Sequence, residues 1–216
     1  MKTISSIVVT LGLLAGVAKV SAQPGNPYPM VGTENPTSYT FKATTTGDII
    51  AYFAGTGASY TEDLGMEVNG VLSPNGFGLP NQSTAVGTAF DLGYAHAGDT
   101  LTFVVDVYSP NLGFVYSNPA LNGGYDSPDD TVGHNHVYSI PYTAGSISEF
   151  GSCPSGTYVG FEDLPFPNSD FNYFDETYVF TDVSVTSSVP DSASTLSLLG
   201  LGFAGLNVLR RRFKAD

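Results

Sequence analysis

The sequence predicts an all-β fold: an antiparallel β-sandwich of jelly-roll type, flanked by an N-terminal signal helix and a C-terminal transmembrane helix. Short alternating runs rich in Tyr, Phe, Val and Thr recur along the chain, and Gly, Pro, Asn and Asp separate them at regular intervals. No window of helical periodicity and useful length lies between these runs. Many short strands joined by tight turns such as Asn69-Gly70 are typical of sandwiches.

We expect nine strands within residues 23–188, which form one acidic domain without an internal repeat or a linker. The expected strands are residues 39–45, 48–54, 65–71, 84–92, 100–108, 113–117, 136–142, 157–162 and 177–186. Residues 23–35 contain Pro24, Pro27 and Pro29, and we expect them to form an extended lead-in.

Residues 1–22 have the pattern of a Sec-type signal peptide. Lys2 precedes an apolar run over residues 4–18, and small residues follow up to Ala22. We therefore expect cleavage between Ala22 and Gln23, which directs the chain into an export route.

Residues 189–216 have the pattern of a membrane stop. A charge-free run over residues 195–209 follows a Pro-containing turn, and the cations Arg210, Arg211 and Arg212 follow the run. We predict a transmembrane helix whose basic flank stays in the cytoplasm, so that the tail holds the chain transiently in the inner membrane. A buried helix of a soluble domain is the alternative, but the apolar side chains cover all faces of the run rather than one stripe.

The turn before this run carries a specific motif, Val189-Pro190-Asp191-Ser192. Together with the apolar run and the Arg cluster, it resembles the PEP-CTERM class of sorting signals, in the variant whose motif is Val-Pro-Asp-Ser-Gly. Ala193 stands where that variant has Gly. The resemblance implies cleavage near the motif by a membrane protease of the exosortase type, and release or transfer of the domain to the cell surface.

The charge of residues 23–188 is strongly acidic. The whole chain has a net charge of −13, and Lys42 is the only Lys or Arg between the two terminal segments. Nucleic acids and anionic bilayers need cationic contacts, so we expect neither as a partner of the domain. Metal ions are the expected partners, although acids also keep exported proteins soluble. Cys153 is the only cysteine, so no intrachain disulfide is expected.

Oxygen ligands are densest between the last two expected strands. We predict a calcium site there, formed by Glu162, Asp163, Asp170, Asn172 and Asp175. Calcium takes six to eight oxygen ligands from carboxylates, amides and backbone carbonyls, and Asp and Asn at alternate positions can turn several of them toward one centre. The spacing is not that of an EF-hand. The alternative is a solvated acidic turn in which Asp170 and Asn172 bond backbone amides.

This segment also resembles an uncharacterised domain that often precedes such sorting tails, with the pattern Gly-Phe-Glu-Asp-Leu followed by Asp-Phe-Asn-Tyr-Asn-Asp. The matching residues are Gly160, Phe161, Glu162, Asp163, Leu164, Asp170, Phe171, Asn172, Tyr173 and Asp175. Phe174 stands where Asn or Asp is usual, so one oxygen is missing. The resemblance includes residues 135–138 and implies a fold and a location but no reaction.

The connection over residues 109–134 is long and polar, which favours a functional loop. His134 and His136 at its end would face the same way on a strand, a spacing compatible with zinc. The alternative is that one imidazole bonds loop carbonyls.

Three function classes fit the sequence. The first is a calcium-binding structural protein of the cell surface or extracellular matrix, associated with exopolysaccharide. The second is a calcium-dependent carbohydrate-binding module. The third is a glycosidase, which needs two carboxylates roughly 5–9.5 Å apart in a cleft. The chain has no Trp and no Ser-His-Asp or Cys-His signature, so we do not expect an enzyme.

Overall fold

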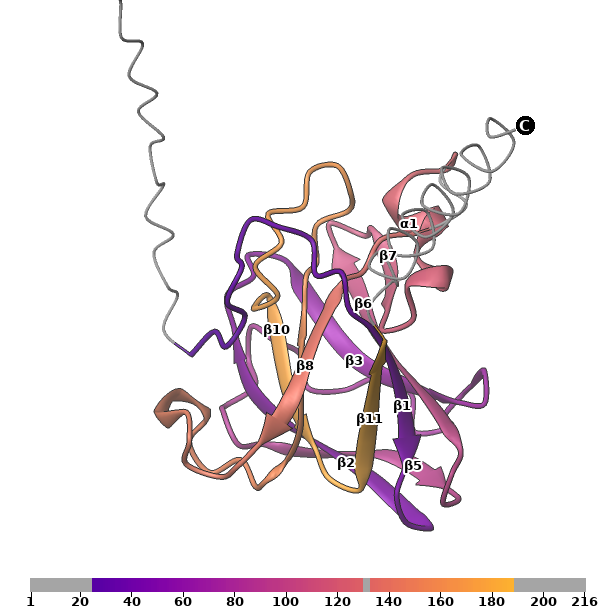
Figure 1. Cartoon of the computed structure of the whole chain (residues 1–216), viewed down its shortest axis with the longest axis vertical. Helices are drawn as coiled ribbons and strands as arrows, with labels where there is room; N and C mark the ends of the chain where they lie inside the picture. Colours follow the sequence, from indigo (N-terminus) through magenta and orange to yellow (C-terminus); the bar gives the residue numbers. More distant parts are fainter. Residues whose placement is uncertain (1–24, 130–132, 189–216) are drawn as a thin grey trace, which may run out of the picture.

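The computed structural model describes residues 25–129 and 133–188, and this part of the chain is an all-β sandwich, as predicted (Figure 1). The six-stranded sheet contains β1 (Ser38–Ala43), β3 (Thr61–Val68), β4 (Val71–Leu72), β6 (Thr100–Ser109), β7 (Gly113–Tyr116) and β11 (Val183–Ser188). The five-stranded sheet contains β2 (Gly47–Thr56), β5 (Ala89–Ala95), β8 (Val137–Tyr142), β9 (Gly156–Phe161) and β10 (Glu176–Phe180). Three short helical segments lie in the connections: η1 (Pro119–Leu121), α1 (Gly123–Asp126) and η2 (Ser148–Phe150).

All strand pairs are antiparallel. The order in the first sheet is β11-β1-β6-β3-β4, with β7 also paired to β6, and the order in the second is β5-β2-β10-β9-β8. Strand β10 therefore has a partner on each side, β2 and β9. The acidic loop, which we define as residues 162–175, joins the end of β9 to the start of β10.

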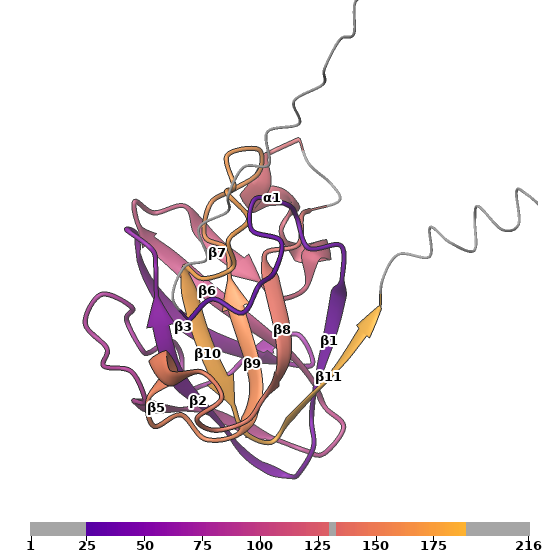
Figure 2. The ribbon, with the colours of Figure 1, turned by 60° about the vertical axis from the view of Figure 1, so that its left-hand side comes forward.

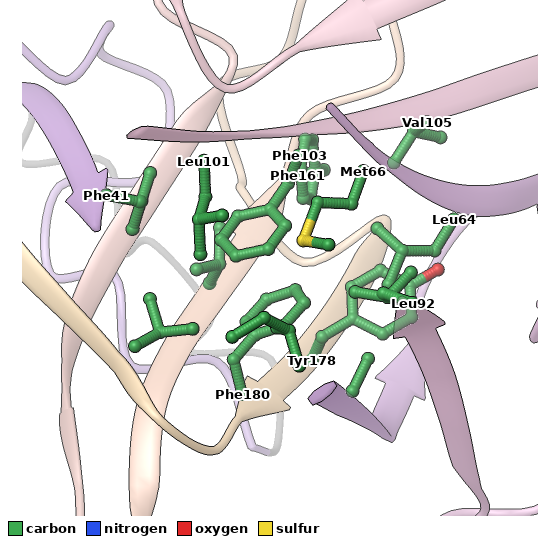
Figure 3. Close-up of a cluster of buried hydrophobic side chains, with 14 of the residues drawn as sticks. Phe41, Leu64, Met66, Leu92, Leu101, Phe103, Val105, Phe161, Tyr178 and Phe180 are labelled. Carbon is green, nitrogen blue, oxygen red and sulfur yellow. The ribbon is translucent and has the colours of Figure 1, made fainter. Parts of the chain in front are cut away.

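The core lies between the two sheets, where alternate side chains of each strand point inward (Figure 3). The aromatic rings of Phe103 on β6 and Phe180 on β10 stack across it, with ring centroids 3.8 Å apart. Leu64 and Met66 on β3 are fully buried against the same cluster. Cys153 is also buried and unpaired, as expected from a single cysteine.

Three strand predictions were wrong in detail. The run over residues 177–186 is two strands in different sheets, because Asp182 takes a left-handed conformation with φ 60° and turns the chain from β10 to β11. Strand β3 begins at Thr61 instead of residue 65, and β5 covers Ala89–Ala95 instead of residues 84–92.

The acidic loop, α1 and the N-terminal segment over residues 25–37 gather at one end of the sandwich, as both views show (Figures 1 and 2). Within residues 25–129 and 133–188, no helix is long and apolar enough to cross a membrane. The predicted signal peptide, with its cleavage site between Ala22 and Gln23, lies outside the described residues, and so does the predicted tail.

Candidate metal centre

The backbone of the acidic loop is tightly curled. Phe171 and Tyr173 both have positive φ, 49° and 54°, which is uncommon for bulky residues without a side-chain reason to adopt it. Such conformations persist only where the surroundings hold them, and they gather at ligand sites. The alternating left-handed residues turn Asp170, Asn172 and Asp175 back toward the end of β9.

This curl brings three predicted ligands together. One carboxylate oxygen from each of Glu162, Asp170 and Asp175 lies within 4.8 Å of the other two. Glu162 and Asp175 are buried, whereas Asp170 is exposed to solvent. The arrangement is a cluster of hard oxygens with two members inside the protein and one at its surface, which is a geometry that a calcium ion can use.

Asn172 lies between these carboxylates as a donor. Its side-chain Nδ2 donates to Asp170 at 3.2 Å and to Asp175 at 3.1 Å, and its backbone N–H donates to Glu162 at 3.0 Å. The side-chain Oδ1 of Asn172 accepts from the backbone of Phe174 at 2.6 Å, which fixes the orientation of the amide. Asn172 therefore offers N–H groups to the cluster, and its Oδ1 is engaged elsewhere.

Asp163, the fifth predicted ligand, lies beside the cluster. Its backbone N–H donates to Asp175 at 3.1 Å, and its carbonyl accepts from the Tyr125 hydroxyl. A cavity of about 250 Å³ opens here, lined by residues 57–60 on one side and by Asp163, Asp170, Asn172 and Asp175 on the other.

The carboxyl groups of this region resist ionisation. Burial, reinforced by the charges of Asp175 and Asp170, raises the pKa of Glu162 to about 9. Burial and the charge of Asp163 raise the pKa of Asp175 to about 8. The pKa of Asp163 is also raised, mainly by burial. These buried acids are crowded together, and both burial and their mutual repulsion disfavour the charged form.

His136 ties the long polar connection to the acidic loop. Its Nδ1 donates to the carbonyl of Glu162 at 2.9 Å, and its Nε2 lies 2.8 Å from an oxygen of Asp126. Burial raises the pKa of the Asp126 carboxyl. The hydrogen bond and charge of His136, with the N–H groups of Phe166 and His134, have the larger effect, so the pKa of Asp126 is lowered overall. Both His136 nitrogens are engaged, so the geometry matches the interpretation in which the imidazole bonds a loop carbonyl.

Tyr173 fixes the other side of the loop. Its hydroxyl accepts from the backbone N–H of Asn35 at 2.7 Å and donates to the carbonyl of Asn135 at 2.9 Å. The Tyr28 ring of the lead-in packs edge-on against the Tyr173 ring, with the two ring centroids 4.6 Å apart. The lead-in, predicted to be extended, is instead folded against the loop.

Two further acids of this region lie outside the predicted set of five ligands. Glu62 and Glu176 are fully buried at the same end of the sandwich. The signal for Glu62 was present in the sequence, because the alternation of Leu64 and Met66 continues backward to it. The expected strand begins only at residue 65, so it does not include Glu62.

Comparison with known proteins identifies the C-terminal segment. A family model described as VPDSG-CTERM motif matches residues 188–213. The chain carries a VPDSG-CTERM motif. This motif is a variant of the PEP-CTERM-like sorting tails, which confirms the resemblance and implies an exported, membrane-transiting protein that is processed by an exosortase-type enzyme and ends at the cell surface. No curated protein and no solved structure matches the chain.

The match covers the motif residues Val189, Pro190, Asp191 and Ser192 and the basic cluster Arg210, Arg211 and Arg212. These residues lie outside the described part of the chain, so their contribution is known from sequence only. The β domain itself has no counterpart among the proteins compared.

Proposed function

We propose that this exported chain is a structural protein of the cell surface or extracellular matrix, and that its acidic loop binds calcium. The observation that carries the proposal is the convergence of Glu162, Asp170 and Asp175 within 4.8 Å. These three side chains supply only hard oxygen atoms, which calcium prefers.

We propose calcium, and not a Lys or Arg side chain, as the counter-charge of these carboxylates, because the described residues contain almost no cationic side chains. Lys42 is the only Lys or Arg in residues 25–129 and 133–188, and it lies exposed on β1. A bound cation exchanges with the protons that the raised pKa values of Glu162 and Asp175 keep on the cluster. Asn172 becomes a ligand only if its amide turns and gives up the bond to Phe174.

The same ion gives the domain a route to acidic exopolysaccharide. A chain with a net charge of −13 repels polyanions, whereas a calcium ion at the exposed Asp170 offers them free coordination positions. The partners proposed are therefore an exosortase-type protease during sorting and exopolysaccharide after it. The proposal assigns no reaction to the domain.

A calcium-dependent carbohydrate-binding module is the second candidate. The cavity of about 250 Å³ favours it, because the half-buried ring of Tyr60 and the carboxylate of Asp170 line the same space. A module of this kind would place one sugar against the ring and its hydroxyls near the ion.

Calcium titration in weakly buffered, cation-free solution tests the proposal. We expect saturable binding with proton release near neutral pH, and loss of both in Asp170→Asn. The matched control, Asp129→Asn, changes an exposed acid of the other polar loop and should bind as wild type. Absence of saturable binding would refute the calcium function. Calcium-dependent binding of neutral oligosaccharides that Tyr60→Ala abolishes would favour the carbohydrate module instead.

A further inference from the structure

The outer face of the six-stranded sheet carries a row of aromatic side chains. Phe114 and Tyr116 lie on β7 with their ring centroids 6.3 Å apart, and the Phe77 ring lies nearly parallel to that of Phe114, with 5.7 Å between centroids and 15° between planes. Val115, between the two β7 residues, is buried in the core, so the alternation of the strand turns Phe114 and Tyr116 away from the other sheet. We call Phe77, Phe114 and Tyr116 the aromatic stripe.

Two features hold the aromatic stripe in place. Gly65 on β3 leaves room for Phe77, because a Cβ atom at this glycine would lie only 2.7 Å from the Phe77 ring. The fully buried side chain of Asn122 bonds both backbone groups of Tyr116, since it accepts from the N–H at 2.8 Å and donates to the carbonyl at 3.0 Å. Phe114 nevertheless keeps 44% of its surface exposed. The aromatic stripe is therefore a fixed surface that remains open to solvent.

An open cavity of about 600 Å³ continues the aromatic stripe at Tyr116. Thr102 on β6 and Glu67 on β3 line it together with Tyr116. Thr102 is only 9% exposed, and within residues 25–129 and 133–188 the hydroxyls of Thr102 and Tyr116 and the carboxylate of Glu67 make no hydrogen bond. An aromatic ring beside a few polar groups without protein partners is typical of a ligand site.

We infer that this cavity and the aromatic stripe form a binding site for a neutral polysaccharide chain. A pyranose ring has an apolar C–H face, which packs on an aromatic ring, and hydroxyl groups at its edge, which donate and accept hydrogen bonds. One sugar unit in the cavity reaches Tyr116, Thr102 and Glu67. The units that follow it along the chain lie on Phe114 and Phe77.

The charge of this face favours a ligand without charge. Glu67 is the only charged residue among those that line the cavity, and Asp63 and Asp106 lie opposite each other on the same outer face, with Phe114 opposite Asp106 on the next strand. These carboxylates repel anionic glycans and nucleic acids, and they repel a second copy of this chain, whose net charge is −13. A neutral sugar meets no such repulsion, and its hydroxyls donate to carboxylates.

The polysaccharide site is separate from the acidic loop and needs no ion. The cavity at the acidic loop is lined by residues 57–60 and by acids of the loop, and the two cavities share no lining residue. The inference rests on the proposed location at the cell surface or in the matrix, where polysaccharide is present, but not on the calcium site. A failure of calcium binding would therefore leave it unchanged.

Native electrophoresis of the full-length protein through gels that contain polysaccharide tests the inference. The protein is kept in a detergent without a sugar headgroup, once with calcium and once with chelator. The probes are soluble neutral glucan, xylan, mannan and galactan, and polygalacturonate is the anionic counterpart. We expect at least one neutral polysaccharide to retard the wild type equally in calcium and in chelator, and polygalacturonate not to retard it.

Phe114→Ala should weaken this binding by roughly tenfold, because it removes one ring of the aromatic stripe. Tyr94→Ala is the matched control. Tyr94 is an aromatic residue with 56% of its surface exposed, but it lies on β5 in the other sheet, so this variant should bind as wild type.

The other outcomes would overturn the inference. Failure of all four neutral polysaccharides to retard the wild type would do so, and so would retardation that Phe114→Ala leaves unchanged. Retardation that chelator or Tyr60→Ala abolishes would assign the binding to the acidic loop instead. Self-association that Phe114→Ala abolishes, measured by light scattering without polysaccharide, would show that the aromatic stripe is a contact between copies of the chain.

Thr102→Val covers the case in which Phe114→Ala does not fold. Val has nearly the shape of Thr, and the hydroxyl that it lacks has no hydrogen bond to lose within the described residues, so the melting temperature should stay close to that of wild type. Binding of the neutral polysaccharide should fall by roughly threefold to tenfold, the effect of one hydrogen bond. Binding equal to wild type in this folded variant would contradict the site.

Discussion

Asp126→Asn tests how the long polar connection holds the acidic loop. One oxygen of Asp126 receives His136 Nε2 at 2.8 Å and the N–H of Phe166 at 3.0 Å, and the other receives the N–H of His134 at 2.8 Å. An Asn in this place presents an NH₂ group to at least one of these donors, whichever way its amide turns. It also removes the carboxylate oxygen that lies 2.8 Å from His136 Nε2.

The expected loss is large because the pair is enclosed. The side chains of His136 and Asp126 are 1% and 0% exposed. Removing one partner of a buried ion pair costs about 3–5 kcal/mol. For a domain of this size about 1 kcal/mol shifts the midpoint by roughly 2–4 °C, so the melting temperature should fall by roughly 6–20 °C.

Circular dichroism melting of wild type and variant in the same calcium-containing buffer measures this change. Asp129→Asn in the same connection is the control. Asp129 is exposed, so this substitution should change the melting temperature by less than about 1 °C. A fall of less than about 3 °C in Asp126→Asn would refute the conclusion that the His136–Asp126 pair fastens the two loops.

Three further predictions concern other parts of the chain. Without divalent cations, the melting temperature should fall by roughly 5 °C or more from pH 5 to pH 8. The pKa values of Glu162 and Asp175 are raised in the folded state, which therefore holds protons that the unfolded state releases near pH 4. Saturating calcium should remove this pH dependence, and a melting temperature that rises from pH 5 to pH 8 without cations would contradict the prediction. Tyr158→Phe should raise the free energy of unfolding by about 1 kcal/mol, since the buried Tyr158 hydroxyl has no hydrogen-bond partner, and a destabilised variant in denaturant titration would disprove this. In a host with an exosortase-type enzyme, the intact mass of surface-extracted protein should fit a chain from Gln23 to about Asp191, whereas a mass that still includes residues 210–214 would show that the tail is not removed.

Much of the fold could be predicted from sequence because alternation and turn residues act locally. Most expected strands agree with the observed ones to within two residues, as for β6 (Thr100–Ser109) and β9 (Gly156–Phe161). The errors arose where the decisive feature was not local. Asp182 ends β10 through a backbone conformation that its neighbours do not require, and the division of strands between two sheets depends on packing.

The candidate site was predicted in composition but not in arrangement. Residues near one another in sequence, Glu162, Asp170 and Asp175, do converge in space. The donor role of Asn172 could not be predicted, since it depends on the left-handed turns beside it. Glu62 lies about a hundred residues from the loop, so only the register of β3 and the pairing of the sheets bring it near Asp163.

Thermal melting in calcium and in chelator at neutral pH tests the central proposal, the calcium site of the acidic loop, most directly. An ion that binds only the folded state at a hundred times its dissociation constant adds about 2.7 kcal/mol. The midpoint of wild type should therefore rise by roughly 5–10 °C, and Asp170→Ala should lose most of this rise while Asp129→Ala keeps it. Equal midpoints of wild type in millimolar calcium and in chelator would contradict the site and leave the acidic loop as a solvated turn.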